Sequence, residues 1–315
     1  MSKMDYTEFT NTYSIVAFDP KKKQLGVAMQ THNFAACNRV IYAEPGVGVV
    51  ASQSFTNPVY GIDGLKMMRE GILPKQILKD LIEQDVDSEY RQVGIMDAKG
   101  NVTAHTGSNC IIEAGHKTGK HYSCQANMML KDTVWDAMAS AFESCDGELV
   151  DCIMDAMEAA EAEGGDIRGA QCAAITIVTS ELVDKPWKGY IYDFKVYDNP
   201  KPLKELRRLI NLKKVANCID SAHIMLREAS IDSIKVASSI ERFTNAVNEI
   251  PNEDSRLQHE FYYAMSLLKC GLKEESISLL KRVFTTSPIW KETAARIAKA
   301  ESNEALYEII NLLSL

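Results

Sequence analysis

The sequence predicts an α+β fold followed by an all-helical region. Strand-like segments occur towards both ends of the first two hundred residues, and amphipathic helical segments lie between them. Hairpins rather than alternating βα units join the strands, which favours layered antiparallel sheets over a Rossmann sheet. Beyond residue 200 the strand pattern ends, and apolar residues recur only at helical spacing.

Three strands are expected to open the first region, followed by two helices. The composition of residues 20–23, "PKKK", suits a hairpin turn between the first two strands. Pro74 suits the first turn of the second helix, where a backbone N–H has no partner. The expected strands are 12–19, 24–31 and 46–54, and the expected helices are 61–71 and 74–85.

A second hairpin, two more helices and the last strands complete this region. The hairpin covers 90–107 and turns at Asp97–Gly100, written "DAKG". A short strand at 121–128 precedes the two helices, and the pair Gly164 and Gly165 ends the second of them. The expected helices are 131–145 and 147–165, and the expected closing strands are 169–180 and 189–198.

The helical tail has the spacing of tetratricopeptide-type helical hairpins. Ala264, Gly271 and Pro288 stand where such a hairpin has a small contact residue, a turn glycine and a terminal proline. Pro251 precedes Pro288 by 37 residues, which is close to one repeat period. Fewer than three units fit, so the tail is expected to pack on the first region or on a protein partner. A plain helical cap is the alternative.

Charge, hydropathy and cysteine spacing exclude several classes of protein. The net charge of −8 argues against a nucleic-acid-binding face. The chain has no apolar run of membrane-spanning length and no signal-peptide core, so we expect a cytoplasmic protein without a membrane partner. Its eight cysteines form neither a C-x-x-C pair nor a zinc-like cluster, which predicts reduced, buried thiols and no metal or other cofactor.

Thr12 is the candidate nucleophile, because it opens the first strand. A Thr at a chain's N-terminus can use its own α-amine, whose pKa is about 8, as the base for its hydroxyl. Here Asn11 precedes Thr12. The amine would therefore be freed by autoproteolysis of the Asn11–Thr12 bond, by a protease or by a later translational start. Otherwise Thr12 is an ordinary strand residue.

Six collinear blocks between residues 12 and 212 resemble the DUF1028 family. They are "TYSIVAFDP", "QLGVAMQT", "GVGVVASQSFTNPVYGIDGL", "RQVGIMDAKGNVTAHTGSNC", "AGHKTGKHYSCQANMM" and "GGDIRGAQCAAITIV". The resemblance implies a place in the N-terminal nucleophile (Ntn) hydrolase superfamily and a four-layer αββα sandwich. It points to Thr12 as the nucleophile. Together with the spacing in the helical tail, it gives an expected organisation of a leader (1–11), an Ntn-like domain (12–212) and a TPR-like helical domain (213–315).

Gln53, Asn57 and His116 are polar candidates that fall within the matched blocks. The amides of Gln53 and Asn57 could orient a substrate or supply an oxyanion donor, and turn chemistry before Pro58 is the alternative for both. His116 lies beside glycines that permit close backbone approach.

A second group of candidates, Asp166, Arg168 and Gln171, lies between a helix end and a strand. An Asp–Arg pair there could bind a substrate carboxylate through two hydrogen bonds, or could serve as a structural salt bridge that fixes the loop.

Three functions follow from these observations. The first is an Ntn-type amidohydrolase that cleaves a small-molecule amide or a peptide through Thr12. The second is a non-catalytic scaffold whose helical tail binds a protein partner, and the third is a protein that binds a metabolite between the sheets without turnover. A homo-oligomer associating through outer helices is also expected.

Overall fold

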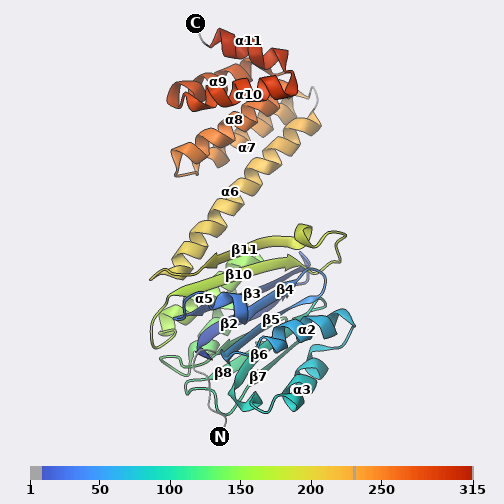
Figure 1. Cartoon of the computed structure of the whole chain (residues 1–315), viewed down its shortest axis with the longest axis vertical. Coiled ribbons are helices and arrows are strands. Elements are labelled where there is room, and N and C mark those ends of the chain that lie inside the picture. The colour runs from blue at the N-terminus through green and yellow to red at the C-terminus, as the bar shows by residue number, and fades with distance from the viewer. Residues whose placement is uncertain (1–8, 230–231, 314–315) are drawn as a thin grey trace. The chain divides into compact units, whose positions relative to one another are not determined.

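The structure is a computed structural model that describes residues 9–229 and 232–313. It divides into two compact units, one ending at Ile210 and the other beginning at Asn211, so the boundary falls within helix α6 (Pro202–Ala229). The first unit is a mixed α/β unit with antiparallel sheets and the second is helical (Figure 1). Among the described helices, none is both long enough and apolar enough to cross a bilayer.

The first unit contains a six-stranded antiparallel sheet that begins with the predicted hairpin. Its strand order is β11-β10-β3-β2-β9-β8. Strands β2 and β3 pair in register from Thr12 with Thr31 to Asp19 with Gln24. The strands are β2 (Thr12–Asp19), β3 (Gln24–Thr31), β8 (Gly115–Gly119), β9 (Tyr122–Ala126), β10 (Cys172–Thr179) and β11 (Tyr190–Val196).

A second antiparallel sheet has five strands, and its central strand β5 pairs on both edges. Strand β6 occupies one edge of β5, and β4 and β1 share the other. The two-residue strand β1 lies in the stretch that was expected to be a leader. The strands are β1 (Phe9–Thr10), β4 (Ile41–Glu44), β5 (Gly48–Phe55), β6 (Arg91–Asp97) and β7 (Val102–Thr106).

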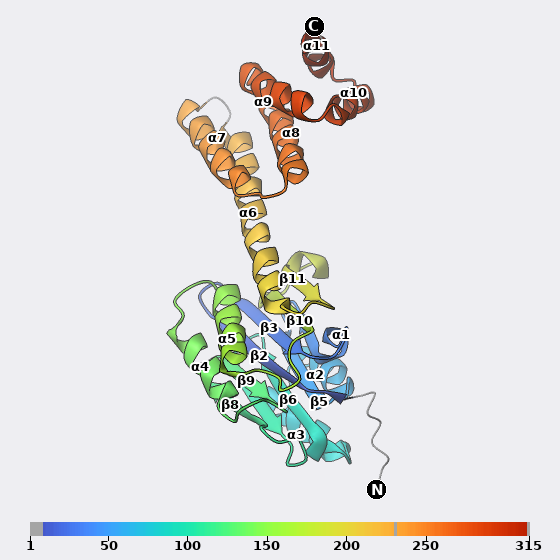
Figure 2. The ribbon, with the colours of Figure 1, turned by 90° about the vertical axis from the view of Figure 1, so that its left-hand side faces the viewer.

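Helices pack on both sheets, as Figure 2 shows with α4 and α5 on one side and α2 and α3 on the other. One apolar core joins the six-stranded sheet to α4, α5 and the start of α6. Another joins the five-stranded sheet to α2 and α3, and a third contains residues of both sheets, including Val16 and Val49. The helices are α1 (Cys37–Val40), α2 (Val59–Arg69), α3 (Pro74–Gln84), α4 (Val134–Ser144) and α5 (Leu149–Glu163).

Local sequence explains where several of these helices begin and end. Pro74 occupies the first turn of α3, as predicted. Gly164 ends α5 with a φ of +127°, a backbone conformation that a residue with a Cβ rarely adopts. Two short 3-10 helices, η2 (Ser88–Tyr90) and η3 (Pro186–Gly189), precede β6 and β11.

The second unit is built from the rest of α6 and five further helices in its described part. Ala264 is buried in its core, and Gly271 has a φ of +81° in the turn between α8 and α9. Pro288 is the N-cap of α10. The helices are α7 (Ser233–Asn248), α8 (Glu253–Lys269), α9 (Lys273–Thr286), α10 (Ile289–Glu301) and α11 (Glu304–Leu312).

The expectation that the cysteines are reduced is wrong for one pair. Cys145 and Cys152 form a disulfide across the loop from α4 to α5. Spacing did not indicate it because six residues separate the two cysteines, and only the turn between the helices brings their Cα atoms to 5.4 Å. The other six cysteines are free thiols, and four of them are buried: Cys37, Cys110, Cys124 and Cys172.

Candidate functional site

Thr12 opens β2 and is completely buried, as are Thr10 and Asn11 before it. Strand β1 places Thr10 opposite Ser54 of β5. Asn11 is the single residue between β1 and β2, so the chain passes at this point from the five-stranded sheet to the six-stranded one. The peptide bond before Thr12 therefore lies inside the unit.

The carbonyl of this peptide bond accepts hydrogen bonds from two side chains. The Thr31 hydroxyl donates to the Asn11 carbonyl oxygen, and Arg168 Nη2 donates to the same oxygen at 3.2 Å. The Thr31 hydroxyl also lies 3.2 Å from Asn33 Oδ1. Two donors on one carbonyl withdraw electron density from its carbon and stabilise negative charge on its oxygen. Negative charge developing on the Asn11 carbonyl oxygen would therefore be stabilised at this position.

The Thr12 hydroxyl points back along the chain. Thr12 Oγ1 donates to the carbonyl oxygen of Thr10 at 2.8 Å, a contact that spans Asn11. The hydroxyl of Thr12 is therefore directed towards the residues that precede it.

The carbonyl of Thr12 itself is fixed by two amide side chains. Gln53 Nε2 lies 3.0 Å from Thr12 O, and Asn127 Nδ2 lies 3.3 Å from the same oxygen. The backbone N–H of Asn127 donates to it as well, at 3.2 Å. Three donors from two different strand ends hold this residue in place, so the main chain on both sides of the Asn11–Thr12 bond is restrained.

A buried polar network between the sheets surrounds Thr12. The Ser14 hydroxyl donates to Gln53 Oε1 at 2.6 Å, and Gln53 Nε2 lies 2.7 Å from Gln92 Oε1. Buried amides that pair with one another in this way avoid the cost of an unsatisfied polar group and rigidify the region. The fully buried members are Ser14, Gln53, Gln92, Ser123, Gln125 and Asn127.

This network reaches the surface at His116. Gln92 Nε2 donates to Thr106 Oγ1 at 2.9 Å, and Thr106 Oγ1 lies 2.8 Å from His116 Nδ1. His116 is exposed as a residue. Partial burial of its ring and, to a smaller extent, the neighbouring His105 lower the pKa of His116. The histidine is therefore connected to Thr12 through intervening side chains and does not contact it.

Arg168 is oriented by Asp166. Its Nε and Nη2 atoms lie 3.0 and 2.7 Å from the two carboxylate oxygens of Asp166. The Asp166 carboxylate is fully buried and also accepts the backbone N–H groups of Arg168 and His32. The pair is thus a structural salt bridge that also holds Nη2 against the Asn11 carbonyl, whereas binding of a substrate carboxylate by Arg168 stays a prediction.

Asn57 and Gln171 have other partners. Asn57 Oδ1 accepts the backbone N–H of Val59, and its Nδ2 lies 3.3 Å from Asp85, so its side chain supports the start of α2. Gln171 donates from its side chain to Asp198 at 3.0 Å. The structure brings Gln53, Asp166 and Arg168 to the Asn11–Thr12 bond and gives these two amides roles elsewhere.

Sequence reasoning missed several residues that contact this bond or support the residues around it. Thr31 ends β3 and was expected only as a strand residue, although its register partner is Thr12. Asn127 follows β9, and Gln92 lies within β6. The available signal was that polar residues interrupt strands that are otherwise buried on both faces, as in "QVGIM" and "CQANM".

Cys172 lies next to Thr31 in the sheet and has an unusual environment for a buried thiol. Its pKa is lowered to about 7, chiefly by a hydrogen bond from the Cys37 thiol and also by nearby backbone N–H groups. The Cys37 thiol has a strongly raised pKa because it donates to Cys172 and is buried. The two side chains belong to the core between the sheets.

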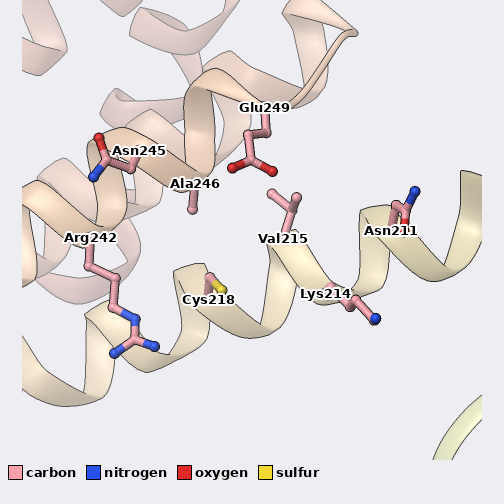
Figure 3. Close-up of a pocket in the computed structure, with 8 residues that line it drawn as sticks. All are labelled: Asn211, Lys214, Val215, Cys218, Arg242, Asn245, Ala246 and Glu249. Atoms are coloured by element: carbon pink, nitrogen blue, oxygen red, sulfur yellow. The ribbon is translucent and has the colours of Figure 1, made fainter. Parts of the chain in front are cut away.

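The helical unit has a separate cavity of about 390 Å³ between α6 and α7 (Figure 3). Two cationic residues, Lys214 and Arg242, line it together with the amides of Asn211 and Asn245. Glu249 is the acidic residue of this lining. All of its lining residues belong to the second unit.

Comparison with known proteins gives a family but no activity. No curated protein sequence matches this chain. The crystal structure of protein SPO2555 from Silicibacter pomeroyi, described as a DUF1028 protein, superposes with a TM-score of 0.57 at 27% identity. The match covers 64% of this chain and 88% of that one. The family model described as "Family of unknown function (DUF1028)" matches residues 12–206 and so starts at Thr12. The chain therefore belongs to the DUF1028 family.

Proposed function

We propose that this chain is the precursor of an Ntn-type amidohydrolase, which cuts its own Asn11–Thr12 bond and then hydrolyses amide bonds with the freed Thr12. The observation that carries the proposal is the Asn11 carbonyl, which accepts hydrogen bonds from Thr31 and Arg168 immediately before a strand-opening threonine. The start of the family match at Thr12 is in keeping with a working N-terminus at that residue.

The proposed fold is a four-layer αββα sandwich. Its support is the set of three apolar cores, one on the outer face of each sheet and one between the sheets. In such an arrangement the polar network around Thr12 lies between the two sheets, where a substrate would bind once the leader had left.

The first chemical step would be an N-to-O acyl shift. Thr12 Oγ1 attacks the carbonyl carbon of Asn11, and the negative charge that forms on the carbonyl oxygen is stabilised by Thr31 and Arg168. The C–N bond then breaks, the hydroxyl proton ends on the Thr12 nitrogen, and an ester joins Asn11 to Thr12 Oγ1. Water hydrolyses this ester, which gives an Asn11 carboxylate and a free Thr12.

The second step would be amide hydrolysis by the mature enzyme. The α-amine of Thr12 accepts the proton of the Thr12 hydroxyl, which attacks the substrate carbonyl. The amine portion of the substrate leaves with a proton, and water hydrolyses the acyl ester. The Thr31 hydroxyl and the Arg168 guanidinium would again stabilise the oxyanion, because the substrate carbonyl takes the place of the Asn11 carbonyl.

Intact-mass measurement of the purified full-length chain tests this proposal. The wild type should convert with time to a species that begins at Thr12, and Thr12→Ala should keep its full mass. Thr12→Ser, which retains a hydroxyl, should still convert. A wild-type chain that stays full-length and shows no activity on amide libraries would argue against the hydrolase.

The cavity in the helical unit favours a second candidate function, which is binding of a protein partner. Cationic side chains beside amides suit carboxylates of an acidic peptide segment. The tail would then be a TPR-like module of a scaffold, with or without catalysis in the first unit. Arg242→Glu in the full chain should abolish capture of such a partner while leaving conversion at Thr12 unchanged. Partner capture that is unchanged by this substitution would show that the cavity does not bind the partner.

A further inference from the structure

Residues 9–11 fill a place in the five-stranded sheet that would be open without them. Strand β4 covers the edge of β5 only from Gly48 to Ala51, and β1 pairs with Ser54 and Phe55 farther along the same edge. Strand β6 occupies the opposite edge. Loss of the leader would therefore expose backbone groups at the end of β5, to which an extended peptide can add as a strand.

Side chains around the leader fit small polar residues. The Thr10 hydroxyl contacts the Thr56 hydroxyl and lies 3.3 Å from the carbonyl oxygen of Ser54. Asn11 Nδ2 contacts the sulfur of Met128, and Asn11 Oδ1 is buried with no hydrogen-bond partner in the described chain. The contacts that hold Asn11 are therefore those of its carbonyl oxygen and of its Nδ2.

Two residues that contact the leader have unusual backbone conformations. Ser54 and Met128 have φ angles of +70° and +57°, a left-handed region that non-glycine residues rarely adopt. Ser54 faces Thr10, and Met128 contacts Asn11. Such strain is retained where the surrounding structure requires it, and it concentrates at ligand-binding and active sites.

We propose that the groove occupied by residues 9–11 is the acyl-side binding site of the mature protein, and that its ligands are extended peptides ending in a small polar residue such as Asn. This inference rests on the proposed scission before Thr12. The first such ligand is the released leader, which binds back as a product with its new carboxylate against Arg168 and Thr31. Substrates of this class place the bond to be cleaved where the Asn11–Thr12 bond lies.

The binding test uses a chain that begins at residue 12, made by proteolytic removal of a tag, and carries Thr12→Ala to prevent turnover. The probe is acetyl-Phe-Thr-Asn with a free α-carboxylate, titrated calorimetrically. We expect saturable binding. The matching C-terminal amide should bind about tenfold more weakly, because it lacks the negative charge that pairs with the Arg168 guanidinium. A peptide with Val in place of Thr should also bind more weakly, since it lacks the hydroxyl that contacts Thr56.

Two controls separate this proposal from the proposed function. The full-length Thr12→Ala chain keeps its leader in the groove and should bind no peptide. Arg168→Lys in the chain that begins at residue 12 should reduce the difference between the acid and the amide, with folding checked by thermal melting. Since that chain contains no bond to cut, these results do not depend on self-processing. Absence of binding at millimolar peptide, or equal binding of acid and amide, would overturn the proposal.

Discussion

The guanidinium of Arg168 donates a hydrogen bond to the carbonyl oxygen of Asn11, a residue 157 positions earlier in the chain. Asp166 orients this guanidinium through two short contacts. The Arg168 side chain is 24% exposed, whereas Asn11 is completely buried, so a partly exposed cation contacts a carbonyl inside the unit.

Replacement of Arg168 should slow scission before Thr12. Arg168→Met removes one of the two donors to the Asn11 carbonyl, and loss of one oxyanion donor typically slows such a step about 100-fold. The rate is measured from a time course of intact mass.

Arg207→Met is the matched control, because the Arg207 side chain is also 24% exposed and also pairs with carboxylates, those of Asp151, Asp155 and Glu158 on α5. This control should be processed at the wild-type rate. Equal rates in the two variants would show that Arg168 stabilises its own loop through Asp166 and does not assist scission.

Replacement of Gln53 should destabilise the first unit. Gln53→Leu removes one buried hydrogen-bond partner from each of Ser14, Gln92 and the Thr12 carbonyl, and the free energy of unfolding should fall by about 2–4 kcal/mol. Urea unfolding followed by circular dichroism measures this change.

Gln171→Leu is the control for that substitution, since its side chain bonds to Asp198 near the surface. We expect a change within about 0.5 kcal/mol for this variant. Similar losses in the two variants would contradict the importance of the buried network.

The stability of the first unit should fall slightly as the pH is lowered through the range in which His116 titrates. Partial burial of the ring, helped by His105, lowers the pKa of His116 below its ordinary value of 6.5. The unfolded chain has the ordinary histidine pKa of 6.5 and the folded chain a lower one, so between these two values the unfolded chain binds more protons than the folded one. The stabilisation of the folded state by the neutral His116 ring is therefore complete above pH 6.5 and is lost as the pH falls through the folded-state pKa.

Comparison with His116→Gln isolates this effect. The difference in unfolding free energy between pH 8 and pH 5 should be larger for the wild type than for the variant, which cannot titrate at this position. An identical pH dependence in both chains would contradict the assignment.

The Cys145–Cys152 disulfide should stabilise the connection between α4 and α5. It joins cysteines seven positions apart, and closing so short a loop is worth about 2 kcal/mol in the chain-entropy account. A double Cys→Ser variant at these positions, and the wild type with reductant, should lose this amount in urea unfolding. Cys218→Ser with Cys270→Ser alters two free thiols and should respond to reductant as the wild type does. A wild type that is insensitive to reductant would contradict the pairing.

Local patterns were sufficient to predict most of the elements but not the site. The hairpin from Thr12 to Thr31 and the helix stop at Gly164 depend on alternation and on glycine conformation, which are properties of neighbouring residues. Strand β1 was missed because a two-residue strand has no periodicity to detect.

The contacts at the Asn11 carbonyl could not be predicted for a different reason. Strand register places Thr31 beside this carbonyl, and a loop far along the chain places Arg168 there. No pattern in the residues near Asn11 predicts either contact. The family resemblance pointed to Thr12 and to the "GGDIRGAQ" segment. Only the structure shows that Arg168 of this segment contacts the carbonyl oxygen of Asn11, directly before Thr12. Asn57 and Gln171 also fall in the matched segments, but their side chains bond to groups away from the Asn11–Thr12 bond.

The most direct test of the account is to identify the residue that carries the free α-amine in protein purified from its native host. Chemical labelling of α-amines followed by peptide mass spectrometry gives this residue. We predict a labelled peptide that begins Thr12-Tyr13-Ser14. A labelled N-terminal peptide that begins upstream and runs through Asn11–Thr12 uncut, as the only one present, would contradict the account.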